Sequence, residues 1–152
     1  MLSRLVPHPP NFTPILAGAI FMPFMVQRSI GIFMPLVIML VSDFIIGLHG
    51  LMLWTYSSLA LITFLSYQHI KRNFFRVLQV AFASPFIFFL ITNFGVWLTS
   101  TAYSPDLVGL INAYTMGLPF LANSLFATVF FSSCFYVIYY SLTHQSELES
   151  NL

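Results

Sequence analysis

Hydrophobic residues in this chain are gathered into long runs that are separated by mostly short polar breaks. Five of these runs cover approximately residues 11–27, 30–48, 51–67, 77–98 and 117–142. A helix needs about 20 apolar residues to cross a bilayer, within a range of about 17–25, and each run meets this length. Short connections make consecutive helices antiparallel neighbours. We therefore predict a single membrane domain over residues 1–152, an all-α integral membrane protein with a bundle of five transmembrane helices.

Residues 104–116 form a shorter apolar segment between the fourth and fifth runs. The segment opens with Ser-Pro-Asp, which supplies a capping hydroxyl, a proline at the first helical position and an acid in the first turn. It is too short to cross a bilayer before Gly117 and Pro119 interrupt it. We therefore predict one short half-helix, re-entrant or lying at the membrane surface, that leads into the last span.

Composition supports lipid as the solvent for most of the chain. Hydrophobic residues make up 59% of the sequence and charged residues 6%, whereas a soluble domain carries about 25% charged residues. The net charge is +1 and no basic patch is present, which excludes nucleic acid as a partner. The single cysteine, Cys134, excludes an internal disulfide and a four-thiolate metal site. No catalytic arrangement of residues stands out, so we predict neither an enzyme nor a bound cofactor.

Loop charges predict the orientation of the bundle. Four basic residues fall on one side of a five-span arrangement, namely Arg28, Lys71, Arg72 and Arg76. Arg4 falls on the other side, together with Asp106. Because basic residues concentrate in cytoplasmic loops, we predict an outside N-terminus and a cytoplasmic C-terminus. Trp54 and Trp97 then lie near the outer interface, where indole rings are favoured.

Asp43 is the one acidic residue inside a predicted span. A carboxylate at membrane depth costs about 2.5–3.5 kcal/mol on insertion scales, so it is retained when something pairs with it or uses it. None of the five runs contains a lysine or an arginine. We therefore expect Asp43 either to be neutral and held by amides and water, or to await a cation from outside.

Polar side chains from three predicted helices reach a similar depth. Counting residues from the outer helix ends places Asp43, Asn93 and Asn123 about 7–9 Å below the outer surface. The same side of the bundle holds other polar or aromatic candidates, namely His8, Asn11, His49, Trp97 and Tyr114. These residues form either a ligand-binding pocket or a set of hydrogen bonds that join helices, each worth about 0.6 kcal/mol on average. We predict the pocket, and we predict no metal, since a His8–His49–Asp43 metal site needs a helix packing that the sequence does not specify.

Two stretches of the sequence carry a resemblance to a known group of proteins. These are residues 4–17, RLVPHPPNFTPILA, and residues 88–97, FFLITNFGVW, with shorter matches around Asp43 and across residues 109–120. They resemble a small uncharacterised bacterial membrane family that is similar in fold to the substrate-binding S components of energy-coupling factor (ECF) vitamin transporters. The resemblance implies a protein of the bacterial inner (plasma) membrane.

In S components a bundle of about six helices captures a small metabolite from outside. The ligand lies under a loop that corresponds to residues 7–14 here, and against helices that correspond to those bearing Asn93 and Asn123. S components carry a helix before the proline-rich motif, whereas residues 1–6 precede it here. We therefore expect an S-component-like bundle with the first helix missing. In S components that helix docks on the energising subunit.

The sequence leaves two functions open. In the first, the chain is the substrate-binding component of an uptake transporter for a vitamin-like small molecule that enters from the outer side. The chain has no ATP-binding motif, so active transport would require energising partner subunits. In the second, the chain is an accessory or structural subunit of a larger membrane complex, and its polar residues only hold the helices together.

Overall fold

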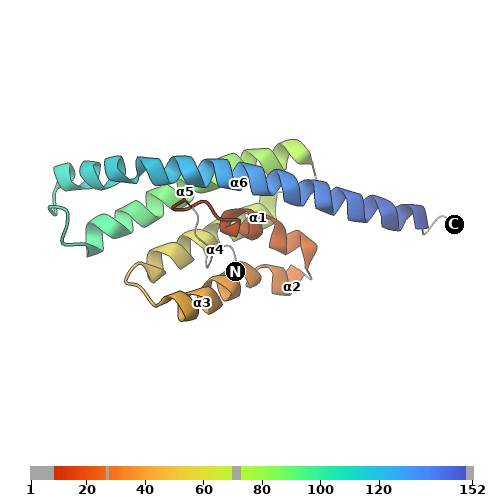
Figure 1. Cartoon of the computed structure of the whole chain (residues 1–152), viewed down its shortest axis with the longest axis horizontal. Helices are drawn as coiled ribbons and strands as arrows, with labels where there is room; N and C mark the ends of the chain where they lie inside the picture. The colour runs from red at the N-terminus through yellow and green to blue at the C-terminus, as the bar shows by residue number, and fades with distance from the viewer. Residues whose placement is uncertain (1–8, 27, 70–72, 150–152) are drawn as a thin grey trace.

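The computed structural model describes residues 9–26, 28–69 and 73–149, and all regular elements in this part of the chain are helices (Figure 1). These are α1 (Ile15–Met25), α2 (Arg28–Gly31), α3 (Met34–Ile46), α4 (Met52–His69), α5 (Phe74–Thr99) and α6 (Leu107–Glu149). The predicted all-α class is confirmed for these residues. Helices α5 and α6 are long and apolar enough to cross a membrane, by length and composition.

Helix α1 lies in the middle of the bundle. It contacts α3, α4, α5 and α6, while α5 and α6 pack side by side along most of α5. Figure 1 shows α6 along one edge of the molecule and α3 along the opposite edge, with α1 between them. The C-terminal part of α6 extends beyond all the other helices. The centre of the protein is therefore built around a short helix near the start of the chain.

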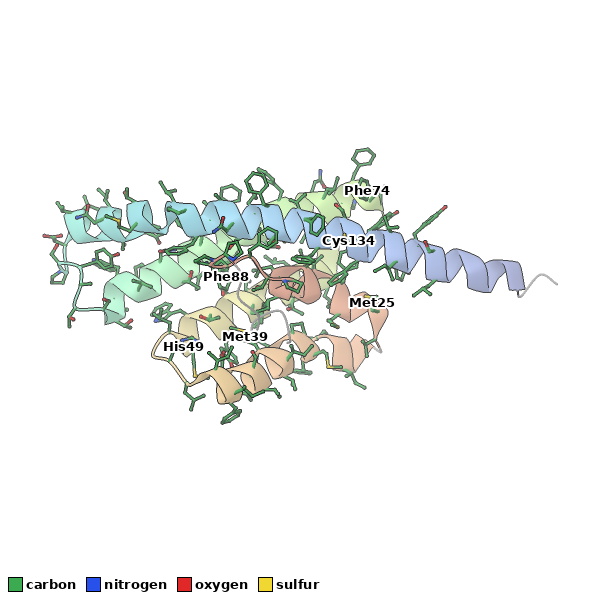
Figure 2. The ribbon with its side chains drawn as sticks, in the orientation of Figure 1. Met25, Met39, His49, Phe74, Phe88 and Cys134 are labelled. Carbon is green, nitrogen blue, oxygen red and sulfur yellow. The ribbon has the colours of Figure 1, made fainter. Side chains whose placement is uncertain are left out.

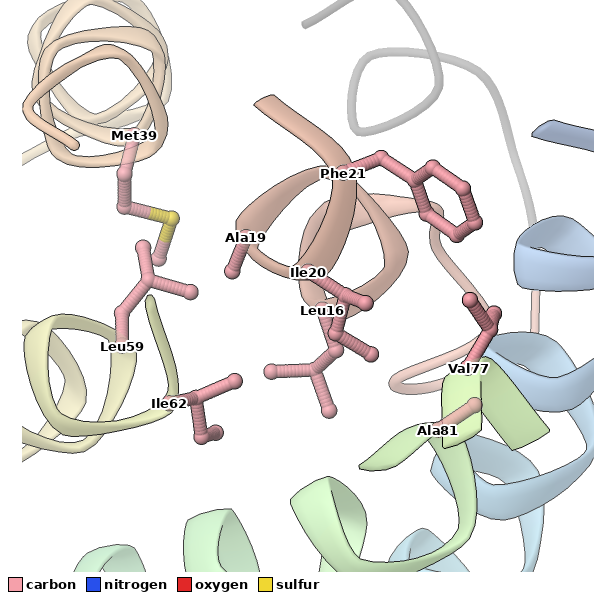
Figure 3. Close-up of a cluster of buried hydrophobic side chains, with 9 residues drawn as sticks. All are labelled: Leu16, Ala19, Ile20, Phe21, Met39, Leu59, Ile62, Val77 and Ala81. Carbon is pink, nitrogen blue, oxygen red and sulfur yellow. The ribbon is translucent and has the colours of Figure 1, made fainter. Parts of the chain in front are cut away.

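The core forms where α1 meets its neighbours (Figure 3). Its buried side chains are Leu16, Ala19, Ile20 and Phe21 from α1, Met39 from α3, Leu59 and Ile62 from α4, and Val77 and Ala81 from α5. Small residues let helix backbones approach closely, and α1 carries two fully buried alanines, Ala17 and Ala19. This is why an 11-residue helix can be enclosed by four others.

The predicted half-helix over residues 104–116 is not a separate element. The structure continues it into the last predicted span as one helix, α6, of 43 residues. The expected break fails because Gly117 serves close packing: a Cβ at this position would overlap the side chains of Asn93 and Phe89 on α5. A proline inside a helix removes one hydrogen bond, yet Pro119 lies within α6 without ending it.

The first two predicted spans are shorter helices than the hydrophobic runs suggest. Residues 9–14 precede α1 outside any helix, and the run over 30–48 divides between α2 and the 13-residue α3, which has proline in its first turn. At 1.5 Å per residue, α1 and α3 are about 17 and 20 Å long, less than the roughly 30 Å hydrocarbon core. The described helices therefore do not establish five full transmembrane crossings.

Candidate functional site

Asp43 lies fully buried in the contact between α3 and α4. The hydroxyl of Tyr56, on α4, donates a hydrogen bond of 2.9 Å to Oδ2 of Asp43. Nε2 of His49 lies 3.6 Å from the same oxygen, close enough for an ion pair when the imidazole is protonated. The predicted spans contain no lysine or arginine, and among the described residues a tyrosine and a histidine approach this acid.

The return of the chain towards Asp43 depends on the connection between α3 and α4. Gly47 follows α3 with φ 124°, a conformation that side-chain-bearing residues rarely adopt. Its N–H donates to the carbonyl of Asp43 at 2.8 Å, which closes the last helical turn. The following residues carry His49 back beside the carboxylate, in the loop between α3 and α4 (Figure 2).

Asn93 lies where α5 packs closely against Gly117 of α6. Its Nδ2 donates to the carbonyl of Phe89, one turn earlier on its own helix, at 2.9 Å. Its Oδ1 faces Gly117 of α6. Nearby, the ring of Trp54 on α4 packs directly over Gly95, where a Cβ would overlap the indole. The amide of Asn93 thus lies at a three-helix junction without bonding to another helix.

Trp97 and Tyr114 hold structural elements together. The indole N–H of Trp97 donates to the carbonyl of Ser104 at 3.0 Å and so ties α5 to the loop before α6. The hydroxyl of Tyr114 donates to the carbonyl of Leu90 at 2.9 Å, which links α6 to α5. The polar atom of each side chain therefore donates a hydrogen bond to the protein backbone.

Asn123 fastens the proline-rich segment to α6. Its Nδ2 donates to the carbonyl of Pro10 at 2.9 Å. The next residue, Asn11, has φ 61°, in the left-handed region that asparagine tolerates better than most residues. Phe12 then packs against Phe131 with ring centroids 6.0 Å apart. The non-helical segment over 9–14 is therefore held against the middle of α6.

Asn11 of this segment lines two cavities. The first, which we call the α1 cavity, has a volume of about 270 Å³ and is lined by Asn11, Thr13, Ile15, Leu16, Met39, Ile46, Thr55, Leu59, Phe88 and Ser124. The second, the α5–α6 cavity, also measures about 270 Å³ and is lined by Asn11, Leu51, Thr55, Phe88, Thr92, Asn93, Val96, Tyr103, Ala113, Met116, Gly117 and Phe120. The two share Asn11, Thr55 and Phe88, so they adjoin one another. In Figure 2, Phe88 and Met39 lie between the α5–α6 pair and α3.

The predicted site residues divide into groups. Asn11 lines both cavities and Asn93 lines the α5–α6 cavity. The others that the structure describes do not line either cavity, namely Asp43, His49, Trp97, Tyr114 and Asn123. His8 lies outside the described residues. Asn123 is six residues beyond Gly117 on α6, about 9 Å along the helix, so it does not share the depth of Asn93 that the sequence predicts.

The predicted site residues did not include two of the most buried polar residues that line the cavities, Thr55 and Ser124. Thr55 is 8% exposed and Ser124 is 4% exposed, and neither hydroxyl makes a hydrogen bond to a described residue. Hydroxyls in apolar helices are ambiguous because most bond to their own backbone, as Thr63 does with Leu59 at 2.8 Å. The one available signal was position, since Ser124 adjoins Asn123.

Metal binding has no support within the described residues, where no group of three or more His, Cys, Asp or Glu side chains could hold an ion. Within the same part of the chain, no acidic or basic side chain lines either cavity. Their chemistry is therefore that of neutral hydroxyl and amide groups among apolar and aromatic walls. Such a lining is typical of sites for small organic molecules.

One protein family, described as a family of unknown function, DUF6580, matches residues 1–150. The chain belongs to the DUF6580 family. Comparison of this DUF6580 protein with curated proteins and with solved structures gives no match. Membership of an uncharacterised family is thus established, while the resemblance to ECF S components stays a prediction.

Proposed function

We propose that this DUF6580 protein is an integral membrane component that binds a small, vitamin-like metabolite within the α1 and α5–α6 cavities and serves its uptake. In this proposal the chain crosses the bilayer five times with its N-terminus outside, and energising subunits drive transport. The observation that carries the proposal is the set of polar groups without a bond to a described residue that line the two adjoining cavities inside an otherwise apolar bundle.

The lining argues against a purely structural role for these polar groups. Groups that join helices form hydrogen bonds across them, because an unpaired polar group in an apolar setting costs about 1–3 kcal/mol by protein mutational data. The hydroxyls of Thr55 and Ser124 form no bond to a described residue, and neither does the side-chain amide of Asn11. They are available to a ligand and contribute nothing to helix association.

The size and the walls of the cavities also suit a small organic molecule. Ligand sites usually measure about 300–1,000 Å³, and the two adjoining cavities together fall within this range. Phe88 borders both of them, and Phe120 and Tyr103 add aromatic surface to the α5–α6 cavity. A flat or compact ring of metabolite size would contact apolar walls on most sides and reach the polar groups at its edge.

Membrane embedding is supported by the outward faces of the helices. Large apolar side chains point away from the core on several helices, including Phe44 (68% exposed), Leu53 (72%) and Phe126 (71%). So many large apolar side chains left exposed are unusual on a soluble monomer. Lipid is the solvent that would accept such faces on α3, α4 and α6 at the same time.

An accessory or structural subunit of a larger membrane complex is the second candidate. The observation that favours it is the position of Asp43, which lies inside a filled contact between α3 and α4 rather than on a cavity wall. Trp97 and Asn123 likewise bond to backbone carbonyls of the chain itself. These residues stabilise the fold under either proposal.

A ligand screen separates the two candidates. The purified full chain in detergent would be heated with a panel of nucleobases, amino acids, water-soluble vitamins and small carboxylic acids. We expect at least one compound to raise the melting temperature of the wild type, and to raise it less in Asn93→Leu, which keeps the branched shape of the side chain but removes the amide of the α5–α6 cavity.

The matched control is Asn112→Leu, because Asn112 is exposed on α6 and lies outside both cavities. Its response to the stabilising compound should equal that of the wild type. If no compound on the panel raises the melting temperature, or if both asparagine variants respond alike, the binding proposal fails and the accessory-subunit candidate gains.

A further inference from the structure

The N-terminus of α1 opens onto the α1 cavity. Thr13, Ile15 and Leu16 line this cavity, and the helix begins between them. The N-cap residue Pro14 provides no side-chain cap. The N–H groups of Ile15 and Leu16 donate to no acceptor among the described residues. The first N–H groups of a helix point out along its axis and carry the positive end of the helix dipole. These donors belong to residues that line the cavity.

An independent observation comes from two deeply buried hydroxyls on other helices. Ser124 of α6 and Thr55 of α4 are each more than nine-tenths buried and line the same cavity, without a bond to a described residue. Most other buried hydroxyls on these helices are satisfied locally, as where Thr63 donates to the backbone carbonyl of Leu59 and Thr128 to that of Ser124. The exception is Ser132 of α6, which has no partner among the described residues and lies outside both cavities. The two cavity hydroxyls are thus left for a group that enters the cavity.

From these two observations, we propose that the α1 cavity binds the carboxylate group of a small monocarboxylic acid. This inference rests on the proposed function and specifies the chemical class of its ligand. Helix N–H groups can only donate, and hydroxyls can donate in the same direction, so the matching ligand group accepts several hydrogen bonds. The helix dipole adds a preference for negative charge on that group.

The surroundings of the cavity favour one negative charge with an apolar body. No lysine or arginine is among its lining residues in the described part of the chain, and from these residues a doubly charged phosphate would lose its hydration without gaining a counter-charge. The remaining walls are apolar and aromatic, with Leu16, Leu59 and Phe88 among them. Asp43, one turn from Met39 on α3, does not line the cavity, and Tyr56 donates to its carboxylate.

Two isosteric probes test the charge directly. Benzoate and benzamide share a ring and a shape, but benzoate is an anion at pH 7 and benzamide is neutral. Calorimetric titration of the full chain in detergent should show that benzoate binds at least tenfold more tightly than benzamide. Thr55→Val and Ser124→Ala should each weaken benzoate binding about tenfold, the loss expected for one hydrogen bond to a charged group.

Each variant has a control on its own helix. Thr63→Val removes a buried hydroxyl from α4 that bonds its own backbone, and Ser132→Ala removes a fully buried hydroxyl from α6 that lies outside both cavities. Both controls should bind benzoate as the wild type does. A melting curve without probe establishes that each variant is folded, and Ser124→Ala carries the test if Thr55→Val does not fold.

Three results would overturn the carboxylate inference: equal affinity for both probes, no binding of either probe, or equal losses in the cavity variants and their controls. None of these results decides the broader proposal. If a neutral compound stabilises the wild type but not Asn93→Leu, the proposed ligand-binding function is supported and only the carboxylate inference is rejected.

Discussion

The hydroxyl of Tyr56 on α4 donates a 2.9 Å hydrogen bond to Oδ2 of Asp43 on α3. A neutral donor therefore meets the one acidic side chain within the predicted membrane spans, and His49 approaches the same oxygen from the adjoining loop at 3.6 Å. The contact explains how an acid can be fully buried between two apolar helices. It assigns Asp43 to the association of α3 with α4.

Removing this hydroxyl should destabilise the fold. In Tyr56→Phe the carboxylate of Asp43 loses a donor in a buried setting, and a loss of about 1–3 kcal/mol in the free energy of unfolding is expected. Ser57→Ala, the adjacent exposed position whose hydroxyl bonds the carbonyl of Trp54, should change it far less. Denaturant titration in detergent measures both. Equal stability of Tyr56→Phe and the wild type would contradict a structural role for the contact.

Gly95 should be intolerant of any side chain. A Cβ at Gly95 would overlap the ring of Trp54, so Gly95→Ala must push α4 away from α5 at a cost of about 1–3 kcal/mol. Gly18 in α1 provides the opposite case, because a Cβ there meets nothing within 4 Å. Gly18→Ala should be neutral or stabilising by up to about 1 kcal/mol. Melting temperatures of the two variants should therefore move in different directions; a shared direction would refute the close α4–α5 contact.

The start of α6 should loosen at acidic pH. Oδ1 of Asp106 accepts hydrogen bonds from the N–H of Gly109 and from the hydroxyl of Ser104, each at 2.7 Å. The bond from Gly109, followed by the one from Ser104, lowers the pKa of Asp106 below its ordinary value of 3.8. Because the folded pKa is lowered, the stabilisation is complete above the unfolded value and disappears as the pH falls through the folded value.

Hydrogen exchange of the Gly109 amide measures this change. The protection factor should be constant from pH 7 to about pH 4, near the unfolded pKa of aspartate, and should fall below that. Asp106→Asn keeps an acceptor oxygen but does not titrate, so its protection should not vary over the same interval. A wild-type profile identical to that of the asparagine variant would mean that the carboxylate does not support the helix start.

Thiol labelling tests the proposed orientation. In a Cys134→Ser background, Thr101→Cys lies in the exposed loop between α5 and α6, and Asn73→Cys lies just before α5. A membrane-impermeant maleimide should label Thr101→Cys in intact cells and Asn73→Cys only after permeabilisation. The reverse pattern would invert the orientation. Labelling of both positions in intact cells would show that α5 does not cross the membrane.

The helices themselves could be read from the sequence with good success. The run over 77–98 predicted a helix that the structure extends slightly to Phe74–Thr99. The run over 117–142 predicted most of α6, but its true start at Leu107 was hidden by Gly117 and Pro119. Glycine and proline are read as helix breakers, and whether they break a helix depends on what packs against them. At Gly117 the partner is Asn93, on a different helix.

The candidate site could be predicted only in part. Asn93 and Asn11 stood out because an amide in an apolar run is unusual, and both line a cavity. Thr55 and Ser124 were not among the predicted site residues, because a hydroxyl in a helix usually bonds its own backbone and the sequence does not show when it fails to do so. Conversely, Asn123 stood out for its chemistry, yet it bonds the carbonyl of Pro10.

By itself, the sequence determined that the chain is helical and suited to an apolar solvent, since the length of its hydrophobic runs and the rarity of charge are local properties. It also located Asp43 as a costly acid. The tertiary structure alone decided that Tyr56 and His49 contact this acid, and that hydroxyls without a bond to a described residue line the α1 cavity. The partners of a polar group come from distant parts of the chain, so its role depends on how the helices pack.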